Sequence, residues 1–218
     1  MQKIFLLSPA YSGGKRAQLI LNPRAGFELA RRLQRREGVP LGEIFSFLSG
    51  LYFRGKLAYS RAFGVAPAGL ASAYVITTSR GLMPVDSPLT LRDLRRFSCV
   101  PIDADDPRYR RPLLRDARRV AKQSADCRVV LLGSISTGKY ADVLLEAFGE
   151  RLHFPIEFVG RGDMSRGGLM LRCVADQREL EYVPVLGASR RGKRPPKLSS
   201  IRWTDRQKVL SRAAVWVR

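Results

Sequence analysis

The sequence predicts an α/β protein with a mostly parallel sheet flanked by helices, followed by a C-terminal antiparallel hairpin and a basic tail. Short apolar runs alternate with segments whose apolar residues recur at helical spacing. Glycine-rich or polar loops follow most of these runs. The chain has 218 residues, of which 45% are hydrophobic, which is enough for a packed core without disulfides.

The predicted strands are short apolar runs. Residues 128–132, Arg-Val-Val-Leu-Leu, form the clearest one, and 3–7 form a buried first strand. Further strands are expected at 73–78, 100–103 and 154–159, and a hairpin is expected to pair 169–174 with 180–185.

The predicted helices lie between these runs. In 24–36, Phe27, Ala30 and Leu33 share one face, and Gly38 to Pro40 ends the helix. Residues 41–63 predict two helical segments around a turn at 50–55. The remaining helices are expected at 89–97, 112–122 and 140–148.

We expect one α/β domain over 1–186 and a basic tail over 187–218. The chain carries 39 Lys and Arg against 19 Asp and Glu, a net charge of +20. The tail holds ten basic residues and one acid, so it contributes 9 of these 20 charges. Such a tail suits a nucleic-acid contact or a solvated arm. Because 31 of the basic residues are Arg, the excess also suits the codon bias of a GC-rich genome.

Four loops leave predicted strands with polar side chains, at 8–16, 79–84, 133–139 and 160–168. Ligands of open α/β sheets collect at the carboxyl ends of strands, so these loops are the candidate site.

The loop 133–139 has the pattern G-x-x-x-x-G-K between a strand and a helix. Tyr140 replaces the Ser or Thr that would reach magnesium in a nucleotide-hydrolysing P-loop. The loop therefore favours a simpler anion-binding turn at a helix N-terminus, with a plain connection as the alternative.

The loop 160–168 contains four glycines, two arginines, an acid and a hydroxyl. Arg161 and Arg166 are suited to grip an oxyanion, and Asp163 to orient a base or a ribose hydroxyl. The alternative is a structural turn, in which the glycines only allow the backbone conformation and Asp163 pairs with an Arg.

Short motifs occur in the order seen in the YaaA peroxide-stress family, which the chain resembles. They are Ile-Phe-Leu-Leu-Ser-Pro-Ala at 4–10, Leu-Tyr-x-x-Gly at 51–55, Ser-Arg-Gly-Leu-Met-Pro-Val-Asp at 79–86, Ser-x-x-Lys-Tyr at 136–140 and Gly-Asp-Met-Ser-Arg at 162–166. The resemblance implies an intracellular DNA-binding protein that limits oxidative damage and has a pocket formed by these loops. The matching positions are Ser8, Tyr52, Gly81, Ser136, Tyr140, Met164, Ser165 and Arg166.

Our first hypothesis is a cytoplasmic nucleic-acid-associated protein whose loop pocket holds a phosphate or a base. The partner is a nucleic acid, with DNA favoured over RNA, or a nucleotide. The candidate ligand-binding residues are Ser8, Tyr52, Arg80, Ser136, Tyr140, Ser165 and Arg166. The candidate nucleic-acid contacts in the tail are Arg190, Arg191, Lys193, Arg194 and Lys197.

Two alternatives stay open. One is an enzyme that processes a nucleotide or a nucleic-acid base, with Lys139 and Asp163 as the catalytic pair. The other is a non-catalytic module that binds a small anion or a partner, with its arginines scattered over the surface. Cys99, Cys127 and Cys173 lack metal-binding spacing, and no apolar run is long enough to span a membrane. We expect no cofactor, no metal and no membrane association.

Overall fold

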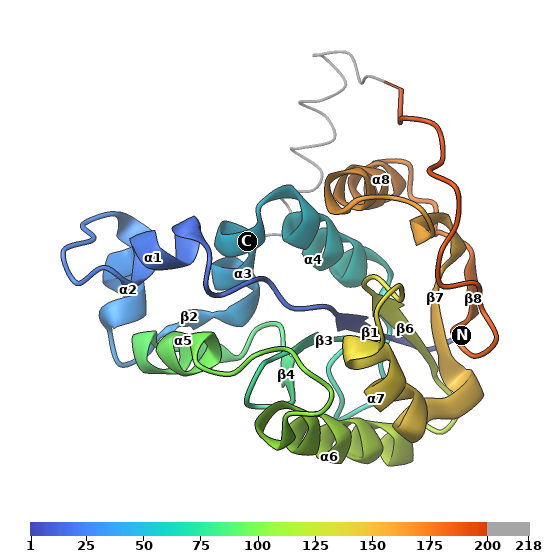
Figure 1. Ribbon diagram of the computed structural model, residues 1–218, viewed down its shortest axis with the longest axis horizontal. Coiled ribbons are helices and arrows are strands. Elements are labelled where there is room, and N and C mark those ends of the chain that lie inside the picture. The colour runs from blue at the N-terminus through green and yellow to red at the C-terminus, as the bar shows by residue number, and fades with distance from the viewer. Residues whose placement is uncertain (200–218) are drawn as a thin grey trace.

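The computed structural model describes residues 1–199, which fold around a six-stranded sheet with the order β4-β3-β1-β6-β7-β8 (Figure 1). The strands are β1 (Lys3–Leu7), β3 (Ala73–Ile76), β4 (Leu82–Pro84), β6 (Arg128–Leu132), β7 (Leu152–Pro155) and β8 (Tyr182–Pro184). The four central strands β3, β1, β6 and β7 are parallel, and the edge strands β4 and β8 are antiparallel to their neighbours. The predicted α/β class is confirmed.

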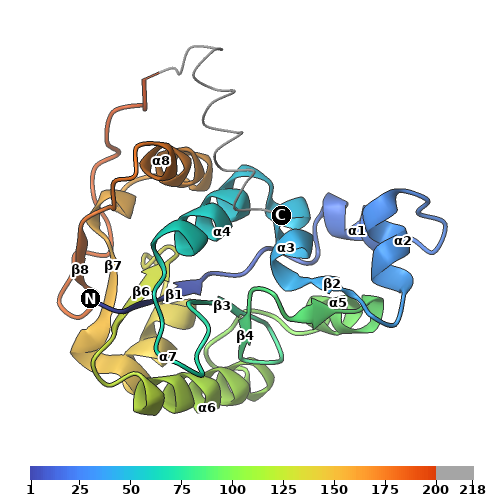
Figure 2. The ribbon, with the colours of Figure 1, turned by 180° about the vertical axis from the view of Figure 1, so that it is seen from behind.

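Helices cover both faces of the sheet (Figures 1 and 2). One face carries α3 (Leu41–Ser49), α4 (Leu51–Phe63) and α8 (Asp163–Ala175), and the other carries α6 (Pro107–Gln123) and α7 (Gly138–Phe148). In β1, Phe5 and Leu7 join the first core while Ile4 and Leu6 join the second, as the pleat requires. Both faces of β1 are therefore buried, which explains its uninterrupted apolar run.

A smaller unit extends from one end of the sheet (Figure 1). It consists of α1 (Lys15–Leu21), α2 (Glu28–Gln34), α5 (Leu91–Ser98) and a two-stranded antiparallel sheet of β2 (Val39–Pro40) and β5 (Pro88–Leu89). A Thr90–Asp93 capping box begins α5. Short 3₁₀ turns at Gly149–Arg151 and Ile156–Phe158 flank β7. Every helix within residues 1–199 is too short or too polar to cross a bilayer.

Several predicted elements are confirmed closely. The strands at 3–7 and 128–132 have the predicted bounds, and 73–78 contains β3. The helices predicted at 89–97, 112–122 and 140–148 correspond to α5, α6 and α7.

The predicted strand at 169–174 is wrong, because these residues belong to α8. Met170, Leu171, Cys173 and Val174 are buried there at helical spacing. An antiparallel C-terminal strand does exist, but β8 pairs with β7 across the sheet edge. The predicted strand at 154–159 ends at Pro155, where the backbone enters a 3₁₀ turn.

Two further predictions need correction. The expected turn at 50–55 is a single break at Gly50, whose φ of 60° interrupts the helix, and Gly55 lies inside α4. Residues 100–103 form no strand. The sequence patterns do not predict α1, β2, β4 or β5; the three strands have only two or three residues each, too few to show a period.

The strand order predicts a ligand-binding crevice at the carboxyl ends of β1 and β6. The chain leaves β1 toward the face of α4 and leaves β6 toward the face of α7, in opposite directions. In doubly wound sheets this divergence is the position at which ligands bind.

Candidate functional site

Ser8 and Gly133 stand side by side at this crevice, each directly after its strand. The Ser8 backbone N–H donates to the carbonyl oxygen of Leu132 over 3.2 Å. A Cβ on Gly133 would lie only 2.8 Å from Ser8 Cβ and 3.2 Å from Ser8 Oγ. The absence of a side chain at Gly133 is therefore what lets the loop after β1 close against the end of β6.

A pocket of about 420 Å³ opens beside Gly133. Three segments form it: the loop after β6, the stretch between β7 and α8, and the chain after β8. Its volume is within the range of small-molecule sites. The polar and glycine residues of its lining are Gly133, Ser134, Ser136, Gly160, Arg161, Gly162, Arg166, Arg190, Arg191 and Gly192.

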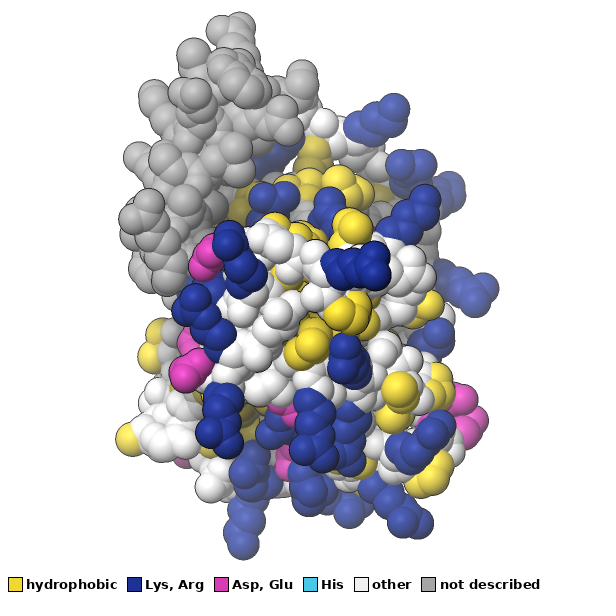
Figure 3. Space-filling model, turned by 90° about the vertical axis from the view of Figure 1, so that its left-hand side faces the viewer, with side chains coloured by type: hydrophobic (Ala, Val, Ile, Leu, Met, Phe, Trp, Pro, Cys, Tyr) yellow, Lys and Arg dark blue, Asp and Glu magenta, His cyan; other side chains and the backbone are white. Residues whose placement is uncertain are grey.

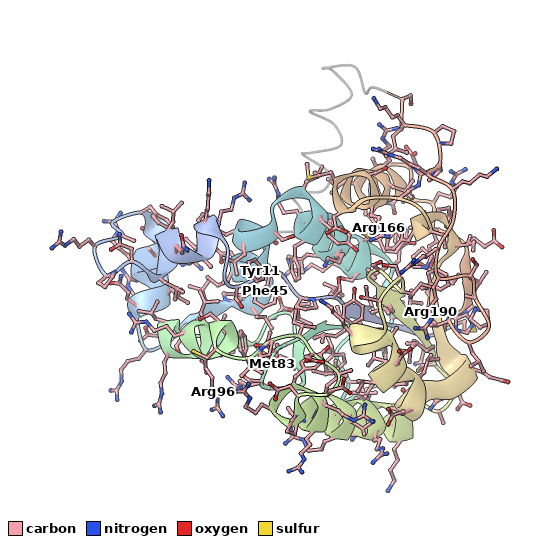
Figure 4. The ribbon with its side chains drawn as sticks, in the orientation of Figure 1. Tyr11, Phe45, Met83, Arg96, Arg166 and Arg190 are labelled. Atoms are coloured by element: carbon pink, nitrogen blue, oxygen red, sulfur yellow. The ribbon has the colours of Figure 1, made fainter. Side chains whose placement is uncertain are left out.

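The pocket lining contains four arginines and no acidic residue among those described. Arg190 pairs with Asp142 of α7, and Arg166 pairs with Asp163, with 3.2 Å between Nη1 and Oδ1. Arg161 Nε is buried without a hydrogen-bond partner in the described part of the chain. Figure 4 shows Arg166 and Arg190 approaching this end of the sheet from different segments. The arrangement suits an anionic ligand with several oxygens.

A second hollow of about 330 Å³ adjoins the first, and Arg161 and Gly162 line both. Met164 and Ser165 of α8 form one side, and Arg194 to Leu198 form the other. Arg161 Nη1 donates to Ser165 Oγ at 3.3 Å and to the carbonyl oxygen of Pro196 at 3.4 Å. Basic groups therefore continue from the pocket along the first turn of α8.

Lys56 lies beneath the site and is fully buried. Its Nζ is 2.6 Å from the Ser8 carbonyl oxygen and 3.0 Å from Ser8 Oγ, and it stands 4.1 Å from the centre of the Tyr52 ring. Burial lowers the pKa of Lys56 to about 7, Asp163 partly opposes this, and Arg166 adds to it. The amine is thus poised between its two protonation states at neutral pH.

Tyr52 and Tyr140 complete the cluster around Ser8 and Lys56. The Tyr52 hydroxyl is buried beside Arg166. Burial raises the pKa of Tyr52, and the charge of Arg166 opposes the rise. The Tyr140 hydroxyl accepts from the Ser134 N–H at 3.1 Å. Burial also raises the pKa of Tyr140, against hydrogen bonds with Ser8 and Ser134.

A close crossing of α4 and α8 brings Arg166 to this cluster. A Cβ on Gly55 would lie 2.7 Å from the Gly167 carbonyl oxygen, and a Cβ on Gly167 would lie 2.7 Å from the Leu51 carbonyl oxygen. The two helices meet backbone to backbone at these glycines. Arg166 is consequently buried beside α4, where its Nε and Nη2 both donate to the Phe158 carbonyl oxygen.

Neither residue of the predicted catalytic pair lines the pocket. Lys139 is exposed in the first turn of α7 and does not line the pocket. Asp163 is exposed at the start of α8, where it pairs with Arg166. Of the G-x-x-x-x-G-K loop, only 133–136 line the pocket, and the Asp142 side chain packs against Gly138.

The predicted ligand-binding residues divide into two groups. Ser8, Tyr52, Tyr140 and Arg166 meet in one cluster, with Ser136 on the pocket wall and Ser165 on the wall of the adjoining hollow. Arg80 lies outside both hollows and pairs with Asp93 of α5 at 3.1 Å.

The segment 187–199 lies against the domain. Arg190 and Arg191 line the pocket, and Arg194 and Lys197 line the adjoining hollow. The carbonyl oxygen of Lys193 packs so tightly against Gly160 that a Cβ there would lie 2.2 Å away. The rest of the predicted tail, 200–218, lies outside the described residues.

Lys56 is the site residue that sequence reasoning missed. The signal was present: the lysine lies on the face of α4 that buries Tyr52, Phe53, Leu57 and Tyr59. A lysine among apolar positions at helical spacing indicates a buried amine with a specific partner.

Basic side chains are also spread widely outside the pocket. Figure 3, which views the end with α1, α2 and α5, shows Lys and Arg distributed among apolar surface. A hollow of about 360 Å³ between α2 and α5 is lined by Arg35, Arg36, Arg92 and Arg95. Positive charge alone therefore does not single out the pocket beside Gly133; its buried Arg166 and its position at the ends of β6 and β7 do.

No family model, curated protein or solved structure matches the chain.

Proposed function

We propose that the protein binds a phosphate-bearing ligand of the nucleotide class in the pocket at the ends of β6 and β7. The observation that carries this proposal is a pocket of about 420 Å³, lined by four arginines and by no acidic residue among those described. Guanidinium groups offer paired donors that match phosphate oxygens, and glycines let the backbone approach them.

The adjoining hollow supports a longer ligand, namely the end of a DNA strand. Arg194 and Lys197 border that hollow, so a backbone leaving the pocket meets further cations. This agrees with the DNA-binding role that the resemblance to the YaaA family implies. A role in limiting oxidative damage rests on that resemblance alone.

The test is fluorescence anisotropy with short single-stranded DNA labelled at its 3′ end, carrying either a 5′-phosphate or a 5′-hydroxyl, across a salt series. We expect tighter binding of the phosphorylated strand and affinity that falls steeply with salt. Arg161→Ala and Arg191→Ala should each weaken binding by about tenfold, the loss of roughly one charged hydrogen bond.

Arg118→Ala is the matched control, because Arg118 is exposed on α6, on the other face of the sheet. Equal weakening by all three substitutions would mean that binding follows net charge rather than the pocket. Indifference to the 5′-phosphate and to salt would overturn the proposal.

A further inference from the structure

A serine hydroxyl and a buried amine stand in hydrogen-bond contact at the edge of this pocket. Ser8 Oγ and Lys56 Nζ are 3.0 Å apart. Lys56 Nζ also contacts the Ser8 carbonyl oxygen, and the Ser8 backbone N–H donates to Leu132. The Ser8 hydroxyl therefore lies between the Lys56 amine and the Tyr140 hydroxyl.

The surroundings of Lys56 favour its neutral form, which a general base requires. The titratable groups that face it are Tyr52 on its own helix, Tyr140 of α7, and Asp163 and Arg166 of α8. Within residues 1–199 Lys56 forms no salt bridge with a carboxylate, and Arg166 disfavours a second cation. A lysine kept in this way accepts a proton near neutral pH.

The hydroxyl lies close to the pocket. Gly133 lines the pocket, and a Cβ there would lie 3.2 Å from Ser8 Oγ. Ser8 Oγ therefore packs against a lining residue that has no side chain. Arg166 connects the pocket with the cluster around Ser8 and Lys56. It lines the pocket, and its charge acts on Tyr52, Lys56 and Tyr140.

We propose that Ser8 is a nucleophile and Lys56 its general base, and that together they attack the phosphorus of a phosphate ester held by the pocket arginines. This rests on the proposed function for the position of the phosphate. The Ser8 Oγ–phosphorus bond forms, the bond from phosphorus to the leaving oxygen breaks, and the hydroxyl proton passes to Lys56 Nζ. The leaving oxygen takes a proton from solvent.

Water then cleaves the phosphoserine. The attacking water gives its oxygen to phosphorus and a proton to solvent, while Lys56 returns its proton to Ser8 Oγ as that oxygen leaves. The net reaction is hydrolysis of one phosphate ester bond. Arg161 and Arg166 neutralise the charge on the non-bridging oxygens in both steps.

The test uses a fluorophosphonate probe on the full chain, with the labelled residue identified by mass spectrometry. The probe forms the same oxygen–phosphorus bond and releases fluoride, so it needs no natural substrate. We expect labelling at Ser8 with a rate that rises through neutral pH. Lys56→Met should slow labelling of Ser8 by about 100-fold, the usual contribution of a general base. In the unaltered protein, Lys56 should carry no label.

Ser12→Ala is the matched control, because Ser12 follows the same strand and is as buried as Ser8, at 5% exposure each. It should leave labelling unchanged, whereas Ser8→Ala should abolish it. Circular dichroism shows whether each variant folds. If Lys56→Met does not fold, the pH dependence of the labelling rate of the unaltered protein still tests the proposal.

Absence of labelling, labelling at another serine, or a rate independent of pH would overturn the proposal. The DNA-binding measurement above is made on the same preparations. If the protein binds DNA but Ser8 does not react with the probe, Ser8 is not a nucleophile and the proposed phosphate-binding pocket is unaffected. If Ser8 reacts with the probe but the protein does not bind DNA, the pocket does not bind phosphate. Ser8 and Lys56 would then lack the phosphate-ester substrate assigned to them, which also contradicts this proposal.

Discussion

Lys56 is the residue at which burial and charge conflict most directly. Taking an amine out of water disfavours its protonated form, and the partners of Lys56 are a carbonyl and a hydroxyl. The pKa of Lys56 accordingly falls from 10.5 to about 7. In the unfolded chain the lysine regains its ordinary pKa, so the stability of the fold depends on pH through this group.

Between pH 7 and pH 9 the unfolded chain binds a proton at Lys56 that the folded chain has released. The free energy of unfolding should therefore rise across this window, by about 1 kcal/mol per pH unit from this group. Lys56→Met removes the titration, so its stability should lack that rise. Urea unfolding of both proteins at several pH values measures the difference, and parallel curves would refute the buried-amine account.

The sequence predicts the position of polar residues that follow strands, but it gives a weaker signal for the buried amine of Lys56. Ser8 and Ser136 lie in the loops that follow β1 and β6, as the rule that ligands collect where parallel strands end leads one to expect, whereas Arg166 lies within α8. Lys139 was chosen for its P-loop spacing, but the structure leaves it exposed outside the pocket. Whether Lys56 or Lys139 is buried depends on tertiary packing, which a local sequence pattern does not reveal.

The crossing of α4 and α8 is the element-scale feature on which the site depends. Gly55 and Gly167 let the two backbones touch, and Arg166 is the neighbour of Gly167. Glycine inside a helix costs roughly 0.5–1 kcal/mol relative to alanine, so this contact offsets a loss of helix propensity.

Gly167→Ala should destabilise the protein by about 1–3 kcal/mol, because its Cβ would meet the Leu51 carbonyl oxygen at 2.7 Å and Tyr52 Cα at 2.8 Å. Gly168→Ala is the matched control in the same helix: its Cβ would meet only Leu198 Cδ1, at 3.6 Å. That change should be neutral or stabilising by up to about 1 kcal/mol. Thermal unfolding compares them, and equal stability of the two variants would contradict a backbone-limited crossing.

Long-range packing also explains where element prediction failed. The buried strands β1 and β6 show themselves as continuous apolar runs. The apolar run at 169–174 looks the same in sequence, yet it is helical because α8 packs across α4. A short apolar run does not distinguish a strand from a buried helix.

At the scale of the whole molecule, the pocket lies at the ends of β6 and β7, which are neighbours in the strand order β3-β1-β6-β7. The loop after β6, the stretch between β7 and α8, and the chain after β8 surround it. The net charge of +20 favours anions everywhere on the surface. Two basic sites therefore compete for a phosphate ligand: this pocket and the hollow between α2 and α5.

Amide hydrogen exchange, followed by mass spectrometry with and without a saturating 5′-phosphorylated DNA strand, answers this most directly. We predict slower exchange on binding in three separate segments, 133–137, 160–166 and 190–192, and unchanged exchange in 34–36 and 91–95. Protection confined to the α2–α5 hollow, or no protection in the three pocket segments, would contradict a phosphate site at the ends of β6 and β7.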